Sequence, residues 1–328
     1  MEKEPALKDL TIDNFRGIKH LEMKDLARIN MLVGKNNCGK TSVLEAVHLW
    51  TGAAFENMEA GVNLFDLFRQ YRIENNVRWL FHKLDVRQNI EITSGEMRLR
   101  IWQAEHNRLK LNKYISDKGV DGLKVITFNS DGLLHPATSD IKNKFKFFTK
   151  STYITHSIFY DGFYANMLEI TRKDQNADMV TSLSKIDDRV TGILPIEGKI
   201  FVKNKDVPEF IPITQMGEGF QRCAAIVAAM ANCENGVFLV DEIDTGLHYS
   251  ALADVWKVVL HTAKALNVQV FATSHSDECI AALFGMLEGE DKAEAALFAI
   301  VRGEDEHRTG RFVTDTVEAA YEMHLELR

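Results

Sequence analysis

The chain has 328 residues, of which 45% are hydrophobic and 26% are charged, so it has room for about two folded domains. This composition is that of an ordinary globular protein, and it excludes a disordered, collagenous or fibrous coiled-coil chain. Lys and Arg number 39 against 47 Asp and Glu, which gives a formal net charge of −8. With no overall positive field, any contact with nucleic acid would need a local basic patch.

The sequence also argues against a membrane protein. Its longest apolar run, 223–231, is well short of the ~18 residues that span a bilayer. The first nine residues lack the apolar core of a secretory signal. We therefore expect a cytoplasmic protein without membrane contact, whose four cysteines are reduced and buried.

The first predicted elements are strands. Residues 7–15 and 20–26 alternate apolar and polar side chains, which predicts a β-hairpin, and 29–33 predicts a short buried strand that runs into Gly34. A helix is expected from about residue 41. Alternation continues further along and predicts more antiparallel sheet at 89–92, 97–101 and 123–128.

The last third of the chain has continuous apolar strands instead of alternating ones. Residues 237–240 and 268–273 each predict a buried strand, and 251–266 between them predicts a helix with one apolar stripe. This strand, helix, strand order predicts a parallel sheet that is covered on both faces. Before it, 164–190 has a helix-compatible pattern.

Residues 34–41 match the pattern G-x-x-x-x-G-K-[ST] and lie between an apolar strand and an apolar helix, as a phosphate-binding loop requires. Gly34 and Gly39 let the backbone curl so that successive N–H groups point at phosphate oxygens beside the helix N-terminus. The pattern therefore predicts a site for a nucleoside triphosphate.

The side chains of this loop have different predicted roles. Lys40 would reach the β- and γ-phosphates, and the Thr41 hydroxyl would bind Mg²⁺. Asn36 and Asn37 either shape the loop or simply face solvent. The residues predicted to contact the nucleotide here are Asn36, Asn37, Gly39, Lys40, Thr41 and Ser42.

Two acidic residues follow the predicted strand 237–240, at the end where open α/β sheets place their ligand sites. Asp241 is suited to hold Mg²⁺ through water, and Glu242 is placed to act as general base toward the attacking water. His275 comes directly after the next apolar strand. A neutral imidazole there can donate a hydrogen bond to the γ-phosphate, so we predict a catalytic role for His275.

These motifs together resemble the ABC-type ATPase heads of the SMC, RecF and OLD group. Residues 10–18, LTIDNFRGI, resemble the I-x-N-F-R-G/S run at the start of that group, 241–248, DEIDTGLH, resemble its Walker-B and D-loop run, and 273–276, TSHS, resemble its switch. The resemblance implies an α/β P-loop NTPase: an ABC-type ATPase head with an N-terminal antiparallel β subdomain and a compact inserted α/β lobe. It also implies ATP and Mg²⁺ as ligands.

The resemblance further implies an ABC signature, for which 216–222, MGEGFQR, is the candidate. This run departs from L-S-G-G-Q, because Gly217 replaces the Ser and Glu218 replaces a Gly, whereas Gly219 is kept. Backbone N–H groups at Gly217 and Gly219 would contact a nucleotide held by a second protomer. The alternative is a simple helix cap that contains glycine.

Arg16 resembles an arginine that the group places near the nucleotide, and the alternative is a surface charge on a hairpin turn. In heads of this group ATP lies between two protomers, so the resemblance implies a homodimer through an ATP sandwich. About 175 residues separate Thr41 from Met216 without sustained heptads, which favours a compact insertion over a coiled coil.

The predicted division of the chain follows from these motifs. Residues 1–110 form the N-terminal half of the head with the P-loop and the antiparallel β subdomain. Residues 111–205 form the inserted lobe, and 206–328 form the C-terminal half with the signature, Walker B and switch histidine. The chain ends about 50 residues after His275, which we expect to be too short for the Toprim nuclease domain of OLD proteins.

Two functions agree with this interpretation. In the first, an ATPase dimerises on ATP and couples hydrolysis to DNA maintenance or anti-phage defence. In the second, a slow nucleotide-gated sensor subunit holds or controls a separate effector protein, such as a Toprim nuclease or a toxin.

DNA contact would use a local patch in which basic and aromatic residues alternate. A strand with Phe inward and Lys outward explains the same pattern more simply. The residues of this patch are Lys142, Lys144, Phe145, Lys146, Phe147, Phe148 and Lys150.

Overall fold

The computed structural model describes residues 6–51, 77–104, 108–115, 126–128, 134–136, 151–154, 162–303 and 306–322. The basic and aromatic patch at 142–150 lies outside these residues. Within them, no helix is long and apolar enough to cross a membrane. The four cysteines are free and buried, as expected.

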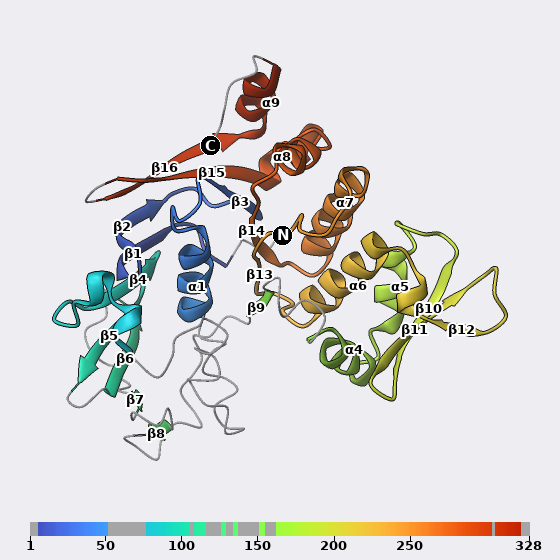
Figure 1. Ribbon diagram of the computed structural model, residues 1–328, viewed down its shortest axis with the longest axis horizontal. Coiled ribbons are helices and arrows are strands. Elements are labelled where there is room, and N and C mark those ends of the chain that lie inside the picture. Colours follow the sequence, from blue (N-terminus) through green and yellow to red (C-terminus); the bar gives the residue numbers. More distant parts are fainter. Residues whose placement is uncertain are drawn as a thin grey trace.

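A six-stranded sheet lies at the centre of the molecule, with strand order β16-β15-β3-β14-β13-β9 (Figure 1). Its neighbours pair in parallel except β15 and β16, which are antiparallel. The strands are β3 (Ile29–Val33), β9 (Ser151–Ile154), β13 (Val237–Val240), β14 (Gln269–Thr273), β15 (Ala295–Arg302) and β16 (His307–Val313). The predicted parallel sheet is therefore confirmed.

The register of this sheet decides where the site lies. Val240 of β13 pairs with Ala272 of β14, and Thr273 of β14 pairs with Leu32 of β3. The three strands consequently end at one edge of the sheet. The loops that follow them carry the three predicted motifs, so parallel pairing alone brings segments together that are far apart in the sequence.

An N-terminal antiparallel sheet packs beside the central one and has the order β2-β1-β4-β5-β6-β7-β8. The predicted hairpin is confirmed, with its turn at Arg16 and Gly17. The strands are β1 (Leu10–Phe15), β2 (Ile18–Met23), β4 (Ile90–Ser94), β5 (Met97–Ala104), β6 (Arg108–Ile115), β7 (Ile126–Phe128) and β8 (Leu134–Pro136). The predicted boundary between residues 110 and 111 falls inside β6, and the division into three parts stays a prediction.

A smaller antiparallel sheet, β10 (Val190–Ile196), β11 (Lys199–Asn204) and β12 (Phe210–Pro212), lies at the opposite side of the molecule with two helices (Figure 1). The helices described are α1 (Lys40–Thr51), α4 (Phe163–Arg172), α5 (Asn176–Leu183), α6 (Glu218–Ala231), α7 (Tyr249–Ala265), α8 (Asp277–Phe284) and α9 (Thr314–Glu322). Short 3₁₀ turns are η2 (Val77–Leu80), η3 (His82–Leu84), η5 (Ile213–Gln215) and η6 (Gly289–Glu294).

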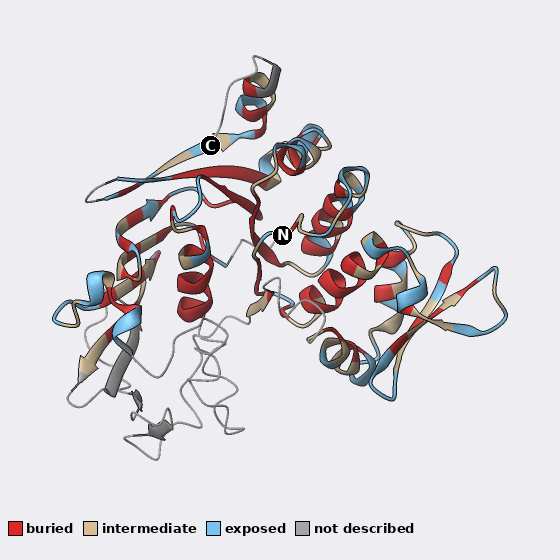
Figure 2. Cartoon of the chain, in the orientation of Figure 1, coloured by how far each residue is buried: buried red, intermediate tan, exposed pale blue. Residues whose placement is uncertain are grey.

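Two hydrophobic cores cover the two faces of the central sheet, because successive side chains of a strand point to opposite faces. Val237 and Leu239 of β13 pack with α1 and the N-terminal sheet, whereas Phe238 and Val240 pack with α6, α7 and α8. Figure 2 shows this burial concentrated in the central strands and the helices beside them. A rigid sheet buried on both faces fixes the edge at which its loops meet.

Candidate functional site

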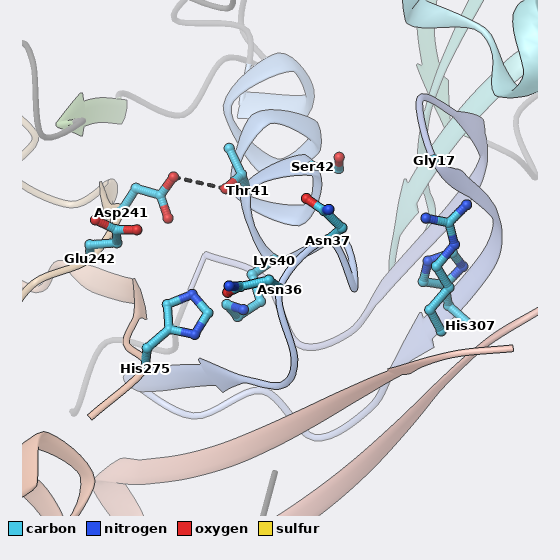
Figure 3. A pocket seen from close by; sticks show the side chains of 12 residues that line it. Gly17, Asn36, Asn37, Lys40, Thr41, Ser42, Asp241, Glu242, His275 and His307 are labelled. Carbon is cyan, nitrogen blue, oxygen red and sulfur yellow. Dashed lines mark hydrogen bonds between the residues drawn. The ribbon is translucent and has the colours of Figure 1, made fainter. Parts of the chain in front are cut away.

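The edge where β3, β13 and β14 end opens into a cavity of about 670 Å³ (Figure 3). It collects residues from the P-loop, the segment after β13, the segment after β14 and two hairpin turns. Its lining residues are Gly17, Asn36, Asn37, Gly39, Lys40, Thr41, Ser42, Asp241, Glu242, His275, Arg302 and His307.

The backbone of the P-loop explains why its two glycines are needed. Gly34 has φ 142°, and a Cβ on it would lie 2.4 Å from the carbonyl oxygen of Ile300. Gly39 has φ 105° directly before α1 begins at Lys40. Both conformations are strained for residues with a side chain. The loop therefore curls against β15 and leaves the N-terminus of α1 facing the cavity, which favours an anion there.

Lys40 lies inside the curl of this loop. Its Nζ donates to the carbonyl oxygens of Gly34 at 2.8 Å and Lys35 at 3.2 Å. Burial lowers the pKa of Lys40, while the carboxylates of Asp241 and Glu242 act in the opposite direction. The ammonium group is thus fixed at the cavity wall, where a phosphate oxygen can become a further partner.

Asp241 is held by two hydroxyl groups from opposite sides. Thr41 Oγ1 donates to its Oδ2 at 2.8 Å, and Thr273 Oγ1 donates to its Oδ1 at 2.5 Å. Thr41 and Asp241 are 200 positions apart in the sequence. Figure 3 shows the bond between them across the cavity.

This pair of oxygens fits Mg²⁺. Adjacent ligands of an octahedral Mg²⁺ site are about 2.9 Å apart when each metal–oxygen bond is 2.0–2.1 Å. The 2.8 Å between Thr41 Oγ1 and Asp241 Oδ2 matches that edge. Among the described residues, no group of three or more His, Cys, Asp or Glu side chains could hold a metal by itself. A site with few protein ligands is typical of Mg²⁺, which usually keeps waters and takes substrate phosphates.

Glu242 has a strained backbone with φ 52°, and three contacts hold it. Its N–H donates to Thr273 Oγ1 at 2.8 Å, and its Oε2 accepts from Thr245 Oγ1 at 3.1 Å. Its carbonyl oxygen accepts from Nη2 of Arg222 at 2.9 Å, and the Nε of that arginine donates to the Ile243 carbonyl. The buried Arg222 of α6 thereby fixes the backbone on which Glu242 sits.

His275 faces the same cavity from the segment after β14 (Figure 3). The next residue, Ser276, caps α8 by accepting from the N–H of Cys279 at 3.1 Å. Ser276 also receives support, because its N–H donates to Ser274 Oγ at 2.9 Å. The cap fixes the turn that carries the imidazole.

Three predicted nucleotide contacts lie outside the cavity of this chain. Arg16 instead points at Glu45 of α1, with its Nε 2.9 Å from Oε2. Gly217 caps the start of α6, and Gly219 packs toward Ala251 of α7. Because the roles of these glycines require a second protomer, they stay predictions, as does a nucleotide contact for Arg16.

Glu218, the first residue of α6, has its carboxylate close to Gly246. Its Oε1 lies 3.3 Å from the position that a Cβ on Gly246 would occupy. The carboxylate is therefore turned toward the loop that connects β13 to α7. The candidate signature keeps an exposed helix N-terminus at Gly217.

Three lining residues were missed by the sequence analysis: Gly17, Arg302 and His307. The first belongs to the β1–β2 turn, and the other two face each other across the β15–β16 hairpin. Gly17 is the glycine of the I-x-N-F-R-G/S run, but within that run only Arg16 was predicted to lie near the nucleotide. Arg302 and His307 sit in no motif with fixed spacing.

Comparison with known proteins agrees with this geometry. Residues 29–281 match the AAA_21 family, described as "AAA domain, putative AbiEii toxin, Type IV TA system". An ATP/GTP phosphatase of Helicobacter pylori is 21% identical over 88% of this chain and 90% of its own length. The DNA replication and repair protein RecF of Lactobacillus acidophilus is 26% identical over 39% of this chain and 32% of its own length.

Solved structures show the same fold at low sequence identity. An SMC head bound to the C-winged helix domain of ScpA covers 97% of this chain and 100% of its own, with TM-score 0.56 and 11% identity. An SMC head with an extended coiled coil from Pyrococcus furiosus covers 98% of this chain and 100% of its own, with TM-score 0.55 and 11% identity. Because the family model covers residues 29–281, the chain belongs to the AAA_21 family of ABC-type ATPases; it is similar to RecF over part of its length and has the fold of SMC heads.

Proposed function

We propose that this protein binds ATP with Mg²⁺ at the P-loop cavity, dimerises around the nucleotide and hydrolyses it. The observation that carries the proposal is the hydrogen bond of 2.8 Å between Thr41 and Asp241, two residues from different motifs and 200 positions apart. A hydroxyl and a carboxylate paired in this way can hold the metal ion that accompanies a bound triphosphate.

The residues of the cavity divide the work of binding. Backbone N–H groups at the start of α1 and the Lys40 ammonium would hold phosphate oxygens. Thr41 and Asp241 would hold Mg²⁺, which when bound neutralises charge on the phosphates. Because Lys40 is already ordered at the cavity wall, little side-chain entropy is lost when a phosphate arrives.

Hydrolysis requires a base and a group near the γ-phosphate. Glu242 is exposed at the cavity, and its backbone is fixed by Thr273 and Arg222, so its carboxylate can take a proton from water without reorganising the loop. His275 would donate a hydrogen bond to the γ-phosphate from the neighbouring strand end. These roles for the two side chains are part of the proposal.

Dimerisation is supported by what surrounds the cavity. Gly217 and Glu218 at the start of α6 are exposed, and Tyr249 at the start of α7 is 69% exposed. In a single chain these groups do not line the cavity. A second copy that presents its α6 N-terminus to the nucleotide would give them a function and would exclude water from the γ-phosphate.

The cellular role that we propose is DNA maintenance or anti-phage defence. The first is supported by the partial similarity to RecF, and the second by the toxin named in the family description. SMC heads of the same fold are known bound to ScpA, which supports a separate partner protein for this chain as well.

The test uses Glu242→Gln, which keeps shape but removes the base. We expect this variant to bind ATP with unchanged affinity, to lose at least about 100-fold in turnover, and to accumulate as an ATP-bound dimer in analytical ultracentrifugation. Glu234→Gln is the matched control, because Glu234 is exposed before the opposite end of β13. Turnover at the parent rate in Glu242→Gln would show that another group is the base.

A second candidate function is a slow, nucleotide-gated subunit that controls an effector. It is favoured by the departure of the candidate signature from L-S-G-G-Q, because Gly217 stands where the signature has a Ser and so offers no hydroxyl to a phosphate. Steady-state turnover with and without DNA separates the two candidates. Stimulation by DNA supports the first, whereas negligible turnover with tight ATP binding supports the second.

A further inference from the structure

The end of the cavity away from Glu242 and His275 has its own set of lining residues. Figure 3 shows His307 and Gly17 on the side opposite to Asp241, Glu242 and His275, with the P-loop between them. Arg302 lines the cavity together with His307. This end has played no part in the proposed chemistry.

The sheet places the two hairpin residues beside the loop. Ala299 of β15 pairs in parallel with Val33, the last residue before the P-loop, and the next carbonyl of β15 lies against Gly34. β15 therefore continues past the loop to Arg302. The chain then turns back, so that His307 pairs with Arg302 in the antiparallel register.

The hairpin is anchored on its far side to the N-terminal sheet. Thr309 Oγ1 donates to the Glu22 carbonyl, and Arg311 Nε donates to the Asp25 carbonyl at 2.9 Å. The wall that carries Arg302 and His307 is therefore held between the central and N-terminal sheets.

The direction of a bound nucleotide follows from these positions. With its γ-phosphate toward Glu242 and His275, as in the proposed function, its phosphate chain would follow the loop to Gly39 at the start of α1. The Nε2 of His307 is 3.5 Å from the position of a Cβ on Gly39. A nucleoside attached to that phosphate chain consequently meets His307 and Arg302.

The side chains at this end of the cavity offer hydrogen-bonding groups that fit the edge of a guanine base. The exposed guanidinium of Arg302 offers hydrogen-bond donors alone, and no ion pair joins it to another of the residues that the structure describes. Burial lowers the pKa of His307, so its ring is neutral at pH 7 and offers one donor and one acceptor. The carboxylates among the lining residues, Asp241 and Glu242, lie at the other end.

Guanine presents two acceptors, O6 and N7, on one edge, and a guanidinium can bind both at once. Adenine replaces O6 by an amino group, and none of the described residues that line this end of the cavity is a carboxylate that could accept from it. Resting on the nucleotide site proposed above, we propose that Arg302 and His307 form the base-binding end of the cavity and that the protein binds GTP at least comparably with ATP.

The experiment measures dissociation constants of ATP and GTP by calorimetry with Mg²⁺ at pH 7.5, so slow turnover does not affect it. For the parent protein we expect the GTP constant to be no more than about three times that of ATP. Arg302→Ala and Arg302→Lys should both weaken GTP by roughly tenfold or more, because lysine keeps the charge but cannot form the bidentate contact. ATP should change by less than about threefold in both variants.

Arg308→Ala is the matched control, because Arg308 is the next residue of the same hairpin and its side chain points to the opposite face of the strand. It should leave both constants within about threefold of the parent. A parent protein that binds ATP but binds GTP more than about threefold weaker would overturn the inference alone. Equal weakening of ATP and GTP by the Arg302 variants would also overturn it, since that result indicates a phosphate contact. Failure of the parent to bind either nucleotide would overturn the proposed function as well.

Discussion

The two ends of the nucleotide cavity are built in different ways. At the phosphate end, Thr41, Asp241, Thr273 and Glu242 are joined by hydrogen bonds of 2.5–2.8 Å, and each residue belongs to a contiguous motif. At the other end, Gly17, Arg302 and His307 come singly from two hairpins. The difference indicates a phosphate end that is organised before a substrate binds; in the inference above, the other end binds the base and contributes selectivity.

Replacing Lys40 should weaken nucleotide binding through the phosphate end alone. We expect Lys40→Ala to weaken ATP and GTP equally, by roughly 100-fold or more, because the charge held at Gly34 serves the phosphates that all nucleotides share. Fluorescence titration with both nucleotides measures the effect. Lys35→Ala is the control, because it removes an exposed lysine side chain from the same loop and keeps the backbone carbonyl that accepts from Lys40. A preference for one base in Lys40→Ala would contradict the division into two ends.

Changing the metal ligand should produce the next largest effect. Asp241→Asn keeps the shape of the side chain and one acceptor oxygen but removes the negative charge of the metal ligand, so we expect the Mg²⁺ concentration for half-maximal ATP turnover to rise at least about tenfold. A magnesium titration of the steady-state rate measures this change. Asp244→Asn, three residues on and outside the cavity lining, should leave the magnesium requirement unchanged. An unchanged requirement in Asp241→Asn would remove Asp241 from the metal site.

The difference between the ends also explains what the sequence could predict. The central strands were predicted because residues such as those of β13 are apolar without interruption, as a strand buried on both faces must be. The meeting of Thr41 with Asp241 then follows from parallel strands that end at one edge. Local sequence patterns were therefore sufficient to predict the phosphate end of the site.

The nucleoside end could not be predicted in the same way. β15 is a buried strand over most of its length, but its pairing with β3 rather than with another strand depends on the whole sheet. Without that pairing, nothing places Ile300 against Gly34 or Arg302 at the cavity. The contact of Arg16 with Glu45 could not be predicted for a similar reason, since it joins the β1–β2 turn to α1, a helix that follows β3 of the central sheet.

Arg222 tests whether the order at the phosphate end depends on α6. Arg222→Met should lower the free energy of unfolding by roughly 2–3 kcal/mol, because it removes the donors of two carbonyl groups at Glu242 and Ile243. Turnover should fall about tenfold or more with ATP affinity within threefold, because Arg222 positions Glu242 without lining the cavity. Chemical denaturation and steady-state kinetics measure the two effects.

The control for Arg222 is an arginine whose ion pair lies at the surface. Arg189→Met, which removes an exposed pair with Asp187, should cost less than about 1 kcal/mol and leave turnover unchanged. If Arg222→Met lost stability but kept full turnover at a temperature where it is folded, the backbone of Glu242 would not need this support.

Glu45 connects the two ends without lining the cavity, since its partner Arg16 precedes Gly17 of the nucleoside end and α1, which carries Glu45, starts at the phosphate end. Burial raises the pKa of Glu45 to about 8, although Arg16 acts to lower it. Between its usual pKa and 8, the folded protein holds a proton that the unfolded chain has released. Stability from this residue is therefore complete at low pH and is lost as the pH rises toward 8.

Glu45→Gln mimics the protonated form and should remove this loss. Relative to the parent, we expect the variant to gain on the order of 1 kcal/mol or more in unfolding free energy between pH 5 and pH 8. Denaturation at several pH values measures it, with the exposed Glu209→Gln as control. Parallel pH profiles for parent and Glu45→Gln would mean that Glu45 is ionised in the fold. Arg16 would then be held by a charged partner instead of a neutral one, which would bind the turn at Gly17 more firmly to α1 and make the nucleoside end as rigid as the phosphate end.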